Sequence, residues 1–309
     1  MSLYSRMAPS GPNGFGYAST AEQVTEGRSL AGRTILITGC NSGLGHEAMR
    51  VLALRGAHVI GAARILAKAR AACAAVSGST TPIACELSDP ASVRACVAAI
   101  KAGGTRVDAL IGNAGIMALP KLQQAHGYEL QFFTNHIGHF MLVTGLLDVL
   151  ADDARVVMLS SAAHTMAPKG GIEFDNLSGE RGYKAWTAYG QSKFANLLFA
   201  KELARRFRGS AGGRTANAVH PGVIHTHLGR HMNMAVGKLA FGIGGALFFK
   251  SIPQGAATEC YVAVNTQAAG ISGAYFADCD VRQPRADAND PALARKLWEV
   301  SEQIVAGLH

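Results

Sequence analysis

The stretch TAYGQSKFAN, residues 187–196, places a phenol and an ammonium four residues apart. Few helix-breaking residues surround it, so we expect a helix on which Tyr189 and Lys193 share one face, one turn from each other. A neighbouring ammonium favours the phenolate and lowers the phenol pKa from its usual value of about 10. The pair could therefore exchange a proton with a substrate. Two exposed surface residues would show the same spacing, so the interpretation depends on the rest of the chain.

A glycine-rich turn stands at the first expected strand–helix junction, in ILITGCNSGLGHEA. Glycine allows a tight turn and lets a ligand approach the backbone closely. The free N–H groups at the start of the next helix would bind a pyrophosphate. Such a turn alone is a weak signal, but this one stands where a dinucleotide site belongs. The residues expected to contact the cofactor here are Gly39, Asn41, Ser42, Gly43, Leu44 and Gly45.

The end of the second expected strand indicates which dinucleotide is bound. A carboxylate there would bind a ribose 2′-hydroxyl and repel a 2′-phosphate. This chain has GAAR instead, with no acid and with Arg64 in reach. A guanidinium binds phosphate through two hydrogen bonds, so NADPH is favoured over NADH. A solvated arginine at a strand end is the alternative.

Strands and helices must alternate to position these groups. The expected strands cover residues 33–38, 57–64, 81–87, 107–115, 154–161, 214–222 and 272–278. The expected helices cover 45–56, 65–76, 89–104, 129–150, 187–207 and 291–308, the third with Asp89 as N-cap and Pro90 in its first turn. This alternation demands parallel pairing with helices on both faces. We predict an α/β fold: a single doubly wound Rossmann-type domain with a mostly parallel seven-stranded sheet.

No repeat or linker divides the chain after its first residues. Residues 1–31 begin with a polar stretch rich in Gly, Pro and Ser, which predicts a flexible N-terminal arm and not a secretion signal. Residues 32–309 are expected to form one dinucleotide-binding and catalytic domain. The most apolar window, 234–249, is interrupted by Lys238 and is too short to span a bilayer. We expect it to belong to a substrate flap at about 230–252, with weak membrane contact as the alternative and no transmembrane segment.

Composition excludes several classes of protein. The 309 residues are 49% hydrophobic and 16% charged, which is typical of a globular chain. The formal net charge of +8 could attract nucleic acid, but the basic residues are scattered. Their densest cluster, Arg205 to Arg208, suits the end of a helix, and no aromatic-rich basic face accompanies it. We expect no nucleic-acid partner.

Cysteine and histidine spacing argues against a metal site. The six cysteines form no C-x-x-C pair, which favours reduced thiols and a cytoplasmic location. The histidine pairs are His136 with His139, and His225 with His227. Neither pair has a cysteine or carboxylate nearby at ligand spacing, so we expect no metal.

Four motifs occur in order along the chain: TGCNSGLG, NAG at residues 113–115, a serine-containing strand end, and YGQSK. In this combination the chain resembles the classical short-chain dehydrogenase/reductase family, from Gly32 to the end. The phrases TNHIGHF, SSAAH and AYGQSKFAN resemble most its retinol-dehydrogenase-like branch. The resemblance implies an oxidoreductase that interconverts an alcohol and a ketone or aldehyde by hydride transfer with NADP(H). The apolar residues of the expected flap indicate that this substrate is lipophilic.

The resemblance also implies roles for single residues. Tyr189 matches the family's acid–base catalyst, and Lys193 matches the residue that binds the nicotinamide ribose. Ser161 matches the hydroxyl that polarises the substrate carbonyl, and it is preferred to Ser160 as the second serine of the pair. Asn135 matches the asparagine that supports a water chain to the lysine.

Further cofactor contacts follow from the same resemblance. They are Glu86 and Leu87 near the adenine, Asn113, Ala114 and Gly115 beside the adenosine, and Pro221, Gly222, Val223 and Thr226 near the carboxamide and phosphates. Two positions depart from the family pattern. Gly112 replaces the first Asn of the usual NNAG, and Glu86 replaces an Asp while keeping the acceptor on a longer arm.

Other interpretations remain open at this point. A non-catalytic dinucleotide-sensing or scaffold protein would share the fold, and a sugar-nucleotide epimerase or dehydratase would share the Tyr–Lys pair. The chain keeps Tyr189, Lys193 and Ser161, which a sensor would be expected to lose. It lacks the glycine spacing and larger C-terminal lobe of the epimerases. A retinoid, a steroid, a fatty aldehyde and a xenobiotic ketone are all compatible as substrates, and a homo-oligomer is compatible with the family.

Overall fold

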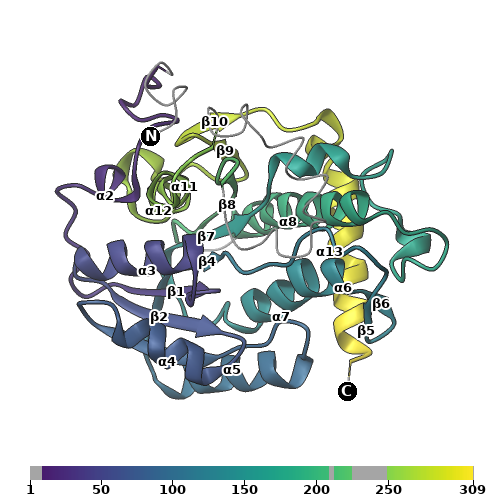
Figure 1. Cartoon of the computed structure of the whole chain (residues 1–309), viewed down its shortest axis with the longest axis horizontal. Helices are drawn as coiled ribbons and strands as arrows, with labels where there is room; N and C mark the ends of the chain where they lie inside the picture. Colours follow the sequence, from purple (N-terminus) through teal and green to yellow (C-terminus); the bar gives the residue numbers. More distant parts are fainter. Residues whose placement is uncertain (1–8, 209–211, 225–248, 309) are drawn as a thin grey trace.

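The computed structural model describes residues 9–208, 212–224 and 249–308. Its main sheet has eight strands in the order β10-β9-β8-β7-β4-β1-β2-β3 (Figure 1). These strands are β1 (Thr34–Thr38), β2 (His58–Ala63), β3 (Thr80–Ala84), β4 (Val107–Gly112), β7 (Leu150–Leu159), β8 (Thr215–His220), β9 (Tyr275–Ala277) and β10 (Asp280–Arg282). A separate small hairpin pairs β5 (Gln124–Ala125) with β6 (Tyr128–Glu129).

Helices connect and cover the strands. The α-helices are α2 (Ala21–Val24), α3 (Gly43–Leu54), α4 (Leu66–Ala74), α5 (Pro90–Ala102), α6 (Leu130–Phe132), α7 (Gly138–Gly145), α8 (Ala185–Phe207), α11 (Ile252–Gly255), α12 (Ala257–Val264) and α13 (Pro291–Ala306). The segment η1 (Phe133–Ile137) is a π-helix, and η2 (Ala162–Met166), η3 (Phe174–Asn176), η5 (Thr266–Ala268) and η6 (Ala286–Asn289) are 3₁₀ turns. The predicted N-cap of α5 is confirmed, since Asp89 accepts the N–H of Ala91 at 3.0 Å.

The sheet separates two apolar cores. In β1, Leu36 points into the core beneath α5, α7, α8 and α13, while Ile35 and Ile37 point into the core beneath α2, α3, α4 and α12. The same alternation continues in β4 and β7. Successive side chains of a strand point to opposite faces, so a strand buried on both sides must be apolar throughout. The predicted doubly wound α/β fold is thereby confirmed.

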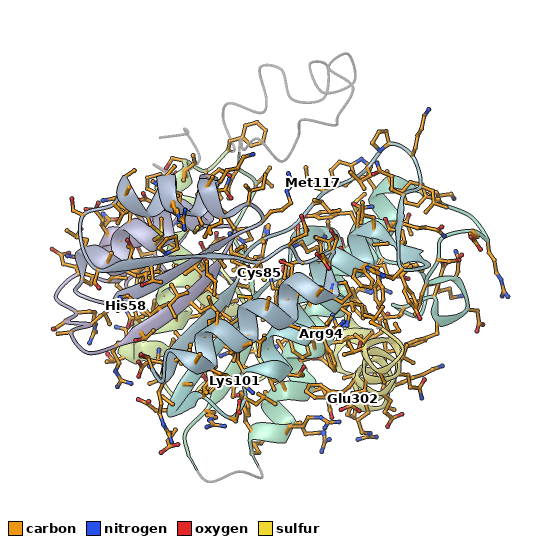
Figure 2. The ribbon with its side chains drawn as sticks, turned by 90° about the horizontal axis from the view of Figure 1, so that it is seen from below. His58, Cys85, Arg94, Lys101, Met117 and Glu302 are labelled. Atoms are coloured by element: carbon orange, nitrogen blue, oxygen red, sulfur yellow. The ribbon has the colours of Figure 1, made fainter. Side chains whose placement is uncertain are left out.

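The strand order reverses at β1, which lies between β2 and β4. In such sheets, ligands bind at this switch point, outside the carboxyl ends of the strands. Figure 2 labels Met117, which follows β4, on the side of the molecule opposite Lys101 at the end of α5. The side of Met117 is therefore the edge at which a cofactor site is expected.

Two details of the predicted fold are wrong. The sheet has eight strands and not seven, because the chain turns at Asp278 and Cys279 and adds β10 antiparallel to β9. The helix expected over 129–150 is broken into α6, η1 and α7 and ends at Gly145, and β7 already begins at Leu150. Hydrophobic periodicity could not reveal the π-turn, because it inserts one residue without changing the apolar character of the segment.

The described part of the expected N-terminal arm is packed against the domain. Asn13 Nδ2 donates to the carbonyl of Cys279 at 2.6 Å and to the Tyr261 hydroxyl at 3.1 Å. Further on, Asn265 Nδ2 donates to the carbonyl of Val24 at 2.7 Å, and α2 carries a capping box at Thr20. Residues 9–31 thus differ from the flexible arm that their composition predicts, since the Asn13 side chain bonds to Tyr261 and to the Cys279 carbonyl, and Asn265 satisfies the Val24 carbonyl. Residues 1–8 lie outside the described residues.

Most of the expected substrate flap, residues 230–248, also lies outside the described residues. Among the residues that are described, no helix is long and apolar enough to cross a membrane.

Glu259 on α12 is a fully buried acid, and neither of its carboxylate oxygens has a hydrogen-bond partner among the described residues. Burial disfavours the charged form and raises its pKa to about 8. In the unfolded chain this carboxyl ionises above a pH of about 4.3, so its contribution to stability is present below that pH and is lost as the pH rises towards 8.

We therefore predict that Glu259→Gln becomes progressively more stable than the wild type as the pH rises from 5 to 8. The difference in unfolding free energy should grow by about 1.4 kcal/mol per pH unit at most. Urea unfolding of both proteins at pH 5, 6, 7 and 8 measures this difference. A constant difference across the series would contradict a neutral, buried Glu259.

Candidate active site

The long helix α8 carries the Tyr–Lys pair at its buried N-terminal half. Tyr189 and Lys193 are 8% and 5% exposed. They lie one turn apart, and Lys193 Nζ stands 5.8 Å from the centre of the Tyr189 ring. Lys193 Nζ donates to the carbonyl of Leu159 at the carboxyl end of β7, at 3.1 Å. The pair is therefore held at the expected edge of the sheet and is not a surface pair.

Ser161 lies beside Tyr189, and its side chain acts to lower the pKa of the phenol. Ser161 also caps η2, because its Oγ accepts the N–H of Ala163 at 3.1 Å. Ser160 points elsewhere: its buried hydroxyl donates to the carbonyl of Lys193 at 2.8 Å. The structure therefore distinguishes the two serines, with Ser161 beside the phenol and Ser160 fixing β7 to α8.

Burial dominates the acid–base properties of this pair. It raises the pKa of Tyr189 to about 12, although the neighbouring Ser161 side chain acts to lower it. It also lowers the pKa of Lys193 to about 8. The expected net lowering of the tyrosine pKa by the lysine is therefore not found in the protein alone. Tyr189 is neutral at neutral pH and can donate a proton.

Asn135 lies in the π-turn η1 and bonds to Ser192, the residue that precedes Lys193. Its Oδ1 accepts the N–H of Ile116 at 2.8 Å, and its Nδ2 donates to the carbonyl of Ile116 and to Ser192 Oγ, both at 2.9 Å. A Cβ on Gly115 would lie 3.1 Å from Asn135 Oδ1 and 3.3 Å from Lys193 Nζ. Asn135 thus fixes the chain after β4 close to the lysine, and π-turns of this kind are frequent at functional sites.

A buried hydrogen-bond chain through His139 was missed from the sequence, which indicated only that this histidine lacks the spacing of a metal ligand. Because a carbonyl can only accept, the contact of 2.9 Å to the Asn135 carbonyl makes Nδ1 of His139 the donor. Nε2 then accepts from Thr38 Oγ1, also at 2.9 Å. Burial lowers the pKa of His139 to about 4, which keeps the ring neutral. The four-residue spacing of Asn135 and His139 in TNHIGH could have indicated that the two residues lie on one face of a helix.

The glycine-rich turn forms a cradle at the end of β1. Gly39 and Gly43 have φ values of +75° and +57°, which favour glycine. A Cβ on Gly45 would lie 2.5 Å from the carbonyl oxygen of Gly39 and would also overlap the Asn113 side chain. Asn41 and Ser42 are exposed beside it, and Ser42 makes no side-chain cap to α3. The N–H groups at this helix start therefore remain available for a pyrophosphate.

The chain after β4 closes the other side of this cradle. Asn113 Nδ2 donates to the carbonyl of Thr38 at 2.8 Å, and the N–H of Ala114 donates to Thr38 Oγ1 at 3.0 Å. Leu44, in contrast, buries its side chain in the core, so only its backbone could contact a ligand. The residues present fit a dinucleotide along the ends of β1 and β4.

Arg64 and Glu86 stand together beyond β2 and β3. The Arg64 side chain is 67% exposed, and its Nε lies 3.5 Å from Glu86 Oε2. Glu86 Oε1 accepts from the N–H and the hydroxyl of Ser88. Leu87 is buried and packs against Gly138. Arg64 is thus largely exposed but paired with Glu86, which is itself held by Ser88.

The loop after β8 begins with Pro221 and Gly222, and Gly222 has a φ of +92°. Val223 is 51% exposed beside it. Thr226, the last predicted cofactor residue, lies outside the described residues, as do His225 and His227. The described residues contain no group of three His, Cys, Asp or Glu side chains arranged to hold a metal. All six cysteines are buried and free.

Comparison with known proteins decides the family. A family model described as short chain dehydrogenase matches residues 33–236. The chain belongs to the short-chain dehydrogenase family. It is 42% identical to short-chain dehydrogenase TIC 32 B, chloroplastic, of Brassica napus, with 96% of each chain covered. It is 39% identical to retinol dehydrogenase 14 of Homo sapiens, with 89% of this chain and 87% of that protein covered.

Solved structures share the fold of this chain. A crystal structure of a putative uncharacterized protein from Mycobacterium paratuberculosis is 34% identical, with a TM-score of 0.75 over 92% of this chain and 97% of that one. The Pseudomonas aeruginosa RhlG/NADP active-site complex is 25% identical, with a TM-score of 0.62 over 80% and 95%. The predicted family and its retinol-dehydrogenase-like branch are confirmed, and the protein is an oxidoreductase of CH–OH and C=O groups.

The cradle makes a prediction for Gly45. Gly45→Ala should lower the free energy of unfolding by about 1–3 kcal/mol through overpacking, and it should weaken dinucleotide binding because the turn must open. Urea unfolding and a fluorescence titration with NADPH measure the two effects. Gly213→Ala is the matched control, because a Cβ there meets no atom within 4 Å. Unchanged NADPH affinity in Gly45→Ala would contradict a cofactor at this turn.

Proposed function

We propose that this short-chain dehydrogenase interconverts a lipophilic alcohol and its ketone or aldehyde with NADP(H), through Tyr189, Lys193, Ser161 and Asn135. One observation carries the proposal: the side chains of Ser161 and Tyr189 lie next to each other, beside the buried Lys193 ammonium. Two hydroxyl groups that meet in this way can bind one substrate oxygen together. The two hydroxyl groups lie at the same edge of the sheet as the glycine-rich turn that we propose to bind the dinucleotide.

The roles of the side chains follow from their protonation. A bound nicotinamide supplies or accepts the hydride. Ser161 and Tyr189 bind the substrate oxygen, which becomes negative as the carbonyl is reduced, and Tyr189 donates its proton to that oxygen. With its pKa raised to about 12, the phenol carries the needed proton at neutral pH. Lys193 binds ribose hydroxyls and, when charged, favours the phenolate that alcohol oxidation requires. Asn135 holds the chain beside the lysine.

Exposed apolar side chains around these residues support a lipophilic substrate. Trp186 is 38% exposed, and its ring meets the Tyr189 ring edge-on at 6.1 Å. Met166, at the end of η2, is exposed as well, and so are Val223 and Ile252, which precede and follow residues 225–248. Apolar substrate surface would cover such groups. The retinol dehydrogenases among the relatives are named for a lipophilic alcohol, which supports the same class.

The enzyme proposal predicts that Tyr189→Phe lowers kcat by about 10²-fold or more, because the proton donor is lost. The measurement is NADPH consumption with straight-chain aldehydes and ketones of increasing length, read in both directions with the matching alcohols. Activity should rise with chain length. Tyr261→Phe is the control, because it also removes a tyrosine hydroxyl. This hydroxyl lies on α12 and, among the described residues, accepts a hydrogen bond from Asn13 alone. Equal rates in wild type and Tyr189→Phe would contradict the mechanism and favour a dinucleotide sensor.

NADPH is the proposed cofactor, because no acid follows β2 and Arg64 is exposed there. We predict that Arg64→Asp raises KM for NADPH by about 10- to 100-fold, since a charged hydrogen bond to the 2′-phosphate is lost. KM for NADH should rise little or fall. Arg106→Asp is the control, as it makes the same charge change at the amino end of β4. An unchanged ratio of the two KM values would show that Arg64 does not select the cofactor.

A further inference from the structure

His220 ends β8 and lies between two segments of the candidate site. Its Nδ1 accepts the N–H of Ala162 at 3.2 Å and the N–H of Gly222 at 3.4 Å. Ala162 directly follows Ser161, and Gly222 belongs to the loop that leaves β8. One ring nitrogen therefore joins the turn that presents Ser161 to the loop expected beside the nicotinamide.

This arrangement requires a neutral ring. A nitrogen that accepts carries no proton, so the proton of neutral His220 resides on Nε2. A proton on Nδ1 would point at two N–H groups. Burial lowers the pKa of His220 to about 4, and of the charged groups that face it, Asp278 raises the pKa while Lys250 and His164 lower it. The acceptor is thus maintained across the neutral pH range.

Lys250 holds the same loop from its other side. The Lys250 side chain is 1% exposed, and its Nζ lies 2.6 Å from Asp278 Oδ1. It crosses Gly222 so closely that a Cβ there would lie 2.6 Å from Lys250 Cδ. The N–H of Lys250 donates to the carbonyl of Val223 at 2.9 Å. With one side of the loop fixed by Lys250, the two bonds of His220 determine where the Ser161 turn lies relative to it.

We propose that neutral His220 is a positioning residue, which sets the Ser161 turn against the Gly222 loop so that the substrate oxygen and the nicotinamide are held in one relative geometry. The inference rests on the proposed function, which gives these two segments their ligands. His220 acts through the backbone N–H groups of Ala162 and Gly222. Because small displacements of reacting groups cost large factors in rate, losing this link affects kcat more than folding.

Two amide side chains separate this role from mere packing. In asparagine, the amide oxygen is two bonds from Cβ, as Nδ1 is in histidine. In glutamine, the oxygen is three bonds away, as Nε2 is. His220→Asn therefore keeps an acceptor at the Nδ1 position, whereas His220→Gln moves it and His220→Leu removes it. If the ring only filled space, glutamine, which is closer to histidine in length, would replace it better than asparagine.

The experiment compares these three variants with the full-length wild type in NADPH-dependent reduction of nonanal. We expect His220→Gln and His220→Leu to lower kcat by about tenfold or more, with smaller changes in KM for nonanal. His220→Asn should stay within about threefold of the wild type. A loss in His220→Asn as large as in His220→Gln, or full activity in all three variants, would overturn the proposal.

Amide hydrogen exchange, measured by NMR without substrate, provides a second readout that is independent of turnover. In the wild type and His220→Asn, we expect the Ala162 and Gly222 amides to be protected. In His220→Gln, both should exchange faster, while the amides of β7 and β8 stay unchanged. Unaltered exchange at Ala162 and Gly222 in His220→Gln would overturn the link. If the wild type reduced no carbonyl but the exchange pattern held, the proposed function would fail while the His220 link would stand.

Discussion

The ammonium of Lys193 must be satisfied inside the protein, and the site is arranged around this need. No carboxylate among the described residues pairs with it, so its hydrogen bond goes to the Leu159 carbonyl at the end of β7. A buried charge without partners would be strongly unfavourable, and burial accordingly lowers the lysine pKa to about 8. The absence of a side chain on Gly115 lets the chain after β4 pass close to Nζ. A bound ribose would complete the polar surroundings of the ammonium.

Three parallel strands supply the groups that meet there. Their carboxyl ends lie at one edge because parallel pairing aligns them, and the edge at β1 and β4 is where the strand order reverses. The ends are fixed to each other by side chains: Asn113 and Ala114 bond to Thr38, and Thr38 bonds to His139. His139 in turn bonds to the backbone of Asn135. The glycine-rich turn and the proposed proton-transfer site are therefore joined by one hydrogen-bond network.

In the protein without cofactor, burial favours proton donation by Tyr189 over proton uptake. A phenol with its pKa raised to about 12 holds its proton firmly, and a lysine with its pKa lowered to about 8 is only marginally charged at weakly alkaline pH. Both shifts arise from the same desolvation, since each charged form loses hydration. The arrangement suits proton donation to a carbonyl, while oxidation of an alcohol needs the positive charge of an oxidised nicotinamide to stabilise the phenolate. In the proposed reaction, a bound nicotinamide would thus contribute to the electrostatics of the site as well as supply the hydride.

The sequence by itself determined the fold class, the glycine turn and the spacing of Tyr189 and Lys193, because each is encoded in a local pattern. The preference for Ser161 over Ser160 came from the resemblance to the family. Periodicity identifies buried strands, and fixed spacing on a helix identifies a shared face. Only the tertiary structure decided what depends on distant partners. The π-turn at Asn135, the chain through His139, the packing of residues 9–31 and the double acceptor at His220 all arise from contacts between separate elements. The tyrosine pKa belongs with these, since burial is a property of the whole fold and no local pattern reports it.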